Sequence, residues 1–183
     1  MHPQTSPTRG RREAGFSQIE ILFATAVLMV AGLAFSRAMV SSMHLADSTR
    51  EHTLASEAAR RVLEELQDAE FADLLVLYNA DPSDDPAGVV GPGASFAVEG
   101  LSAAADDADG LVGAVEFPLS GGKLLEDVAL RDFGLPRDLD GSGDIDDFDH
   151  AGDYALLPVR ITVRWRTDGN PMQVVLRSLL AQR

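Results

Sequence analysis

The fold is decided by a stretch near the N-terminus, Gly15-Phe16-Ser17-Gln18-Ile19-Glu20, at the start of a long apolar run. From Phe16 to Ser36, Glu20 is the only residue with a formal charge. A helix of that length would reach about 31 Å, enough to cross the hydrocarbon core of a bilayer. A carboxylate near the start of a membrane helix is energetically costly to place in the bilayer, so Glu20 is expected to need a partner group.

The charges on either side of the apolar run predict its orientation. Arg9, Arg11 and Arg12 precede the run with only Glu13 against them, and the next basic residue after it is Arg37. This excess of positive charge favours an N-terminus in the cytoplasm. The rest of the chain would then face outward.

Two other interpretations of the apolar run stay open. A secretory signal peptide ends in small residues after its apolar core, and Ala31-Gly32-Leu33-Ala34 could serve as such a cleavage site. An ordinary membrane anchor that carries Glu20 by chance is the second alternative. The apolar run begins directly after Gly15.

The order of glycine, phenylalanine and a glutamate four residues later resembles the type III signal of type IV pilins and type II secretion pseudopilins. The resemblance implies that a prepilin peptidase cuts between Gly15 and Phe16 and methylates the new amino group of Phe16. It further implies that Glu20 pairs with the N-terminal amine of a neighbouring subunit, which supplies the partner that an intramembrane carboxylate needs. Ser17-Gln18 replaces the family's commoner Thr-Leu and leaves both positions intact.

The resemblance implies a pilin-like α+β fold, in which a long N-terminal helix packs on a small antiparallel sheet. The expected organisation is a cytoplasmic leader over 1–15, a transmembrane and assembly helix over 16–40, the outer half of that helix over 41–80, and an exported globular region over 81–183. The chain would cross the bacterial inner membrane once, with its C-terminal domain in the periplasm or in a surface fibre after assembly. Its expected partners are prepilin peptidase and other pilin or pseudopilin subunits.

One long helix is the simplest interpretation of the segment before Pro82, because no proline or glycine follows Gly32 until that point. Apolar residues recur every four positions in its outer half, at Leu54, Ala58, Val62 and Leu66. They predict a face for a domain to pack against. Further apolar residues extend this face as far as Tyr78.

The C-terminal segment predicts a hairpin. Apolar and polar residues alternate from Val159 to Arg166, and Asp168-Gly169 is a favoured pair for a two-residue turn. The turn predicts three apolar cross-strand pairs: Ile161 with Leu176, Val163 with Val174, and Trp165 with Met172. The polar face carries a basic stripe, expected to be solvated or to contact another subunit, that comprises Arg160, Arg164, Arg166 and Arg177. The hairpin also resembles the terminal hairpin of minor pilins and minor pseudopilins.

A second chemical signal lies in residues 138–149, whose sequence resembles the calcium loop of EF-hands and dockerins. The predicted ligands of Ca²⁺ at loop positions 1, 3, 5, 7, 9 and 12 are Asp138, Asp140, Ser142, the carbonyl of Asp144, Asp146 and Asp149. Gly143 provides the sharp turn at position 6. Hard oxygen donors at alternating positions suit calcium. The carboxylates would repel one another strongly without a cation.

Two departures from the EF-hand pattern qualify this prediction. Asp149 stands where an EF-hand has a bidentate glutamate, although dockerin loops resemble this sequence there. Pro136 and Gly152 flank the loop, so paired long helices are not expected. The alternative to a solitary calcium loop is an acidic, disordered linker. His150, beside the loop, is expected to be solvated.

Composition narrows the function classes. The 183 residues carry a formal charge of −14, and the loss of a +2 leader would leave −16, so direct binding of nucleic acid is not expected. There is no cysteine, and the sequence contains no nucleophile elbow or phosphate-binding glycine motif, so an enzyme is not expected. The predicted function is a minor pilin or pseudopilin with a calcium-stabilised exported domain. The alternative is a membrane-anchored, calcium-dependent module that recruits an exported substrate or surface ligand.

Overall fold

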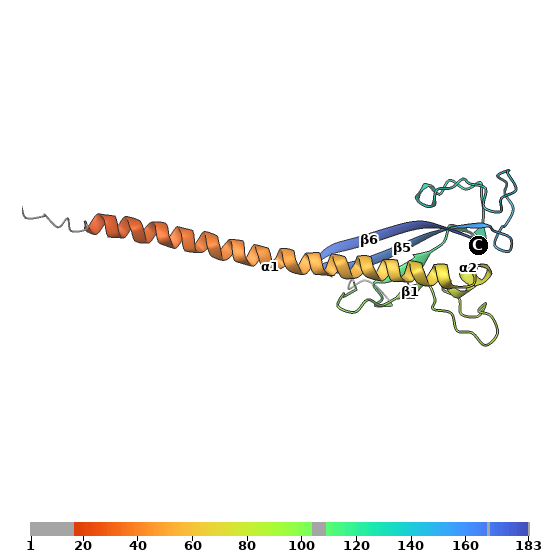
Figure 1. Cartoon of the computed structure of the whole chain (residues 1–183), viewed down its shortest axis with the longest axis horizontal. Helices are drawn as coiled ribbons and strands as arrows, with labels where there is room; N and C mark the ends of the chain where they lie inside the picture. Colours follow the sequence, from red (N-terminus) through yellow and green to blue (C-terminus); the bar gives the residue numbers. More distant parts are fainter. Residues whose placement is uncertain (1–16, 104–108, 168, 183) are drawn as a thin grey trace, which may run out of the picture. The chain divides into compact units, whose positions relative to one another are not determined.

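The computed structural model describes residues 17–103, 109–167 and 169–182. The chain divides into two compact units, residues 1–46 and 47–183. Helix α1, Gln18–Asp68, begins in the first unit and ends in the second (Figure 1). The second unit also holds every strand, so the described chain has an α+β fold with a long N-terminal helix.

Helix α1 ends at Asp68, so the prediction of a helix as far as residue 80 is wrong. Glu70 has extended backbone (φ −63°, ψ 120°), and the chain continues in a 3-10 turn, η1 (Phe71–Asp73), and a short helix, α2 (Leu74–Leu77). The hydroxyl of Tyr154 donates a hydrogen bond of 2.5 Å to the carbonyl of Phe71, and the two rings pack at 4.9 Å. Burial raises the pKa of Tyr154 to about 12, which keeps this donor protonated.

The buried face of α1 lies beside the predicted one. Val62 and Leu66 are buried as predicted, but the other buried helix residues are Ala55 and Ala59, while Leu54 and Ala58 are half-buried. A strict spacing of four drifts around a helix of 3.6 residues per turn. The observed spacing of four, three and four keeps all four buried residues on one side.

The main sheet is antiparallel, with strand order β1-β2-β5-β6. Its strands are β1 (Ser95–Phe96), β2 (Gly113–Glu116), β5 (Leu156–Thr167) and β6 (Asn170–Ala181). A separate pair joins β3 (Leu119–Ser120) and β4 (Lys123–Leu124). A Cβ at Gly113 would lie 2.2 Å from the ring of Phe96, so a larger residue there would displace that ring.

The predicted hairpin is confirmed, including its register. Thr167 pairs with Asn170, and the three predicted apolar pairs, Ile161 with Leu176, Val163 with Val174 and Trp165 with Met172, are all present. The apolar side chains of β5 at odd-numbered positions are buried, and they join the buried residues of α1 in one core. Thr162 breaks the predicted alternation because it is also buried, beneath Glu116, whose Oε2 accepts a hydrogen bond of 3.4 Å from its hydroxyl.

Candidate functional site

Glu20 lies in the first turn of α1 and is exposed. The carbonyl of Ser17 accepts hydrogen bonds from the backbone N–H groups of Glu20 (3.0 Å) and Ile21 (3.2 Å), which closes this first turn. Gly15 and Phe16, the predicted processing residues, lie outside the described residues. The structure therefore places Glu20 in the first turn of a long helix.

The helix that carries Glu20 is long and apolar enough to span a membrane. An 18-residue stretch of this helix has a mean hydropathy of 2.1, and all of that stretch is exposed. Hydroxyl groups in this segment bond to the helix itself: Thr25 donates to the carbonyls of Ile21 (3.0 Å) and Leu22 (2.9 Å), and Ser36 donates to that of Gly32 (2.9 Å). Polar groups satisfied within one helix are what an apolar surrounding requires.

The acidic loop, residues 138–149, is held by carboxylates that accept hydrogen bonds from the loop backbone. The two oxygens of Asp138 accept from the N–H groups of Gly141 (2.6 Å) and Gly143 (2.8 Å), and Asp140 accepts from that of Ser142 (2.8 Å). Gly141 and Gly143 have φ of 81° and 94°, which favours glycine at both positions. In the part of the chain that the structure describes, a 3-10 turn, η2 (Arg131–Phe133), precedes the loop and no α-helix flanks it, as Pro136 and Gly152 predict.

Glu126 organises the same loop from outside it, and the sequence analysis missed this residue. Its side chain is fully buried, and Oε1 accepts hydrogen bonds from the N–H groups of Leu139 and Asp140 (3.2 Å). Its second oxygen accepts from that of Asp146 (3.3 Å). Three N–H donors offset the cost of burying this carboxyl group. A single glutamate after two leucines gives no sequence signal for such a role.

His150 is buried, with 4% of its surface exposed, so the expectation that it is solvated is wrong. Its ring nitrogens lie 3.1 Å from carboxyl oxygens of Asp146 and Asp153. Burial alone would lower the pKa of His150, but the hydrogen bonds to these two aspartates and the charge of Glu126 together outweigh it and raise this pKa. His150 therefore favours its protonated form inside an acidic cluster.

Among the described residues, one group of three His, Asp or Glu side chains converges enough to share a metal ion: Glu126, Asp140 and His150, with candidate ligand atoms within 4.8 Å of one another. Asp140 is the only predicted calcium ligand in this group. Asp149 instead accepts hydrogen bonds from the N–H groups of Leu124 (3.0 Å) and Ala151 (3.2 Å). The oxygen donors of the loop suit calcium, whereas an imidazole is not an ordinary calcium ligand. Calcium at this loop stays a prediction.

Comparison of the chain with protein-family models, with curated proteins and with solved structures finds no match. The functional interpretation therefore depends on the residues and their geometry. The two features that carry it are the exposed apolar helix with Glu20 and the acidic loop around Glu126 and His150.

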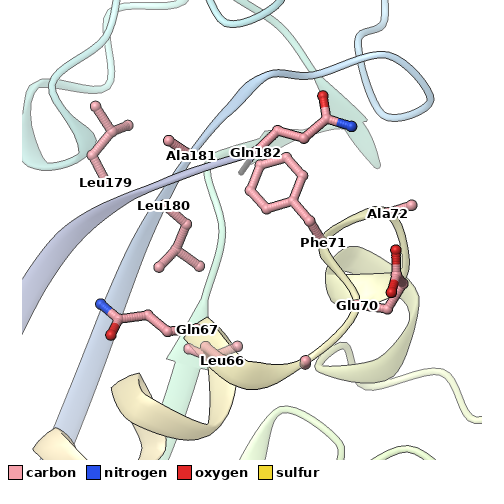
Figure 2. Close-up of a pocket in the computed structure, with 10 residues that line it drawn as sticks. Leu66, Gln67, Glu70, Phe71, Ala72, Leu179, Leu180, Ala181 and Gln182 are labelled. Carbon is pink, nitrogen blue, oxygen red and sulfur yellow. The ribbon is translucent and has the colours of Figure 1, made fainter.

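A cavity of about 450 Å³ lies where α1 and η1 meet the end of β6. Figure 2 shows the side chains of Leu66, Phe71 and Leu180 around this hollow, one from each of these elements. Among the described residues that line it, Glu70 is the only ionisable one, beside the amide side chains of Gln67 and Gln182.

Proposed function

We propose that this chain is a minor subunit of a pilin-like assembly, either a type II secretion pseudopilus or a type IV pilus-like fibre. The observation that carries the proposal is a helix whose exposed apolar part begins with Glu20 and whose outer part packs on an antiparallel sheet ending in a hairpin. An exposed apolar surface of this length needs a membrane or neighbouring helices to cover it. Glu20 would then pair with the amine of an adjacent subunit.

Substitution of Glu20 tests this proposal. Glu20→Ala in the full chain should be cleaved normally, as judged by the mass of its N-terminal peptide, but should fail to enter the assembled fibre. Gln18→Ala, two residues away on the same exposed helix, is the matched control and should be incorporated like the wild type. Normal incorporation of the Glu20→Ala chain would remove the assembly role.

A membrane-anchored, calcium-dependent binding module is the second candidate. It is favoured by the tip of the acidic loop, where Ile145 and Phe148 are 51% and 69% exposed beside the predicted cation ligands. Such apolar side chains could contact a partner once a cation fixes the loop. The full chain in detergent should then capture an exported protein in calcium and release it on chelation, and failure under both conditions would argue against this candidate.

A further inference from the structure

Among the strands that the structure describes, β5 is the only neighbour of β6 in the sheet, so β6 is an edge strand. The pair Thr167 and Asn170 flanks a two-residue turn, so even-numbered residues of β6 direct their backbone groups toward β5 and odd-numbered ones direct them away. The other side of β5 supports this assignment: the N–H groups of Arg164 and Arg166 donate away from β6, to the carbonyls of Val112 (2.7 Å) and Ser102 (3.3 Å).

The outer edge of β6 is open along most of its length. In the part of the chain that the structure describes, the outward N–H groups of Gln173, Val175, Arg177 and Leu179 have no hydrogen-bond acceptor. Pro171 occupies an outward position, where its missing N–H removes no bond to β5. A long row of unpaired backbone groups is a template for another extended chain.

The side chains along this edge predict what such a chain would carry on the face toward α1. Met172, Val174 and Leu176 lie on this face, opposite the buried residues of β5, and each is only half-buried. A strand added at the edge would cover their exposed parts with its own alternate side chains. Apolar residues at those alternate positions would therefore be favoured.

The opposite face of the hairpin is basic in a chain whose formal charge is −14. Arg160 forms an ion pair with Glu116 at 2.8 Å, and Arg177 lies 3.5 Å from Asp132. Arg164 and Arg166, near the turn, are exposed.

These two arginines make no ion pair with any residue that the structure describes. They lie on β5 opposite Gln173 and Pro171 of β6, so β6 alone would separate them from a chain added at the open edge. Acidic residues in the added chain would meet this charge.

We propose that the open edge of β6 binds an extended segment of another polypeptide in which apolar and acidic residues alternate. The backbone of that segment pairs with the outward groups of β6. Its apolar side chains cover Met172, Val174 and Leu176, and its acidic side chains face Arg164 and Arg166. This inference does not depend on the proposed assembly function, because it uses only the hairpin.

Peptides of opposite charge test the inference. The probe is a synthetic eight-residue peptide of alternating glutamate and valine, titrated into the full chain in detergent micelles and followed by fluorescence anisotropy. The comparison peptide has lysine in place of glutamate. The acidic peptide should bind at least about tenfold tighter, and the preference should fall in the Arg164→Ala/Arg166→Ala chain. Equal binding of the two peptides would overturn the proposal.

A backbone test separates strand addition from simple charge attraction. Val175→Pro removes one outward N–H, at an odd-numbered position of β6 like that of Pro171. Val175→Ala is the control that keeps this N–H. Binding of the acidic peptide should weaken about tenfold in the proline variant and less than about twofold in the alanine variant. Equal affinities for the two variants would overturn the proposal.

Two further measurements keep the inference testable if the proline variant does not fold. Two versions of the acidic peptide carry N-methyl groups, one at its odd-numbered residues and one at its even-numbered residues. Only one of the two versions should lose affinity for the unmodified chain. Loss in neither version would contradict backbone pairing. Concentration-dependent dimers of the wild-type chain that Val175→Pro abolishes would assign the edge to a second copy and would overturn the acidic partner.

Discussion

Nε1 of Trp165 donates a hydrogen bond of 3.0 Å to Oε2 of Glu51, which joins the last hairpin to α1. The hydroxyl of Thr167 donates to the same oxygen. The ring of His52 packs edge-on against Trp165, with centroids 6.3 Å apart. One carboxyl group of the helix thus receives two donors from the end of β5.

Glu51→Ala should destabilise the second unit by about 1–3 kcal/mol, because the indole and hydroxyl donors lose their shared acceptor. Glu51→Gln keeps an oxygen acceptor and should cost less. Urea unfolding of the full chain in detergent can follow the fluorescence of Trp165, the only tryptophan in the sequence. Glu57→Ala, on the exposed side of α1, is the control. Equal stability of the Glu51→Ala and Glu57→Ala chains would show that this contact contributes nothing.

Glu126→Gln should loosen the acidic loop, because one of its carboxyl oxygens is replaced by an amide group that cannot accept from the loop backbone. Hydrogen exchange should become faster at the amides of Leu139, Asp140 and Asp146. Asp127→Asn makes the matched change at the neighbouring exposed position and should leave the loop unaffected. Unchanged exchange in the Glu126→Gln chain would contradict the role assigned to this residue.

Calcium should raise the melting temperature of the second unit if the acidic loop binds it, because a ligand that binds only the folded chain stabilises it. The expected rise should disappear in Asp138→Asn, which changes loop position 1. Asp147→Asn removes the same charge at position 10, which supplies no ligand, and should retain most of the rise. Differential scanning calorimetry with calcium, magnesium and a chelator makes the comparison. A rise in Asp138→Asn equal to that of the wild type would rule out the predicted site.

His150 should make stability fall as the pH rises toward alkaline values in the presence of a chelator. Burial opposes protonation, but Asp146, Asp153 and Glu126 raise the folded-state pKa of His150, so protonation stabilises the fold. This contribution is complete below the ordinary value of about 6.5 and is lost as the pH passes through the raised value. The stability difference between the wild type and His150→Gln should shrink as the pH rises above about 6.5. A constant difference would contradict the raised pKa.

The elements predicted correctly from the sequence are those that local patterns determine. The hairpin follows from alternation on β5 and from turn chemistry at Gly169, so even its register was predictable. The apolar helix follows from composition. In both cases the residues that carry the information lie within a few positions of the structure they specify.

Contacts between distant residues account for what the sequence did not predict. No glycine or proline marks the end of α1, and the break that follows it is stabilised by Tyr154, which lies 83 residues beyond Phe71. Glu126 reaches Asp146 across 20 positions. The burial of His150 depends on that same packing, because the surrounding sequence is polar and would otherwise predict exposure.

The dependence of the acidic loop on Glu126 and Leu124 means that residues 138–149 are not a portable unit. A graft of these twelve positions into another scaffold would carry the aspartates but lose the buried acceptor and the amide that binds Asp149. An engineered or evolutionary transfer of this loop would therefore have to move residues 124–150 together.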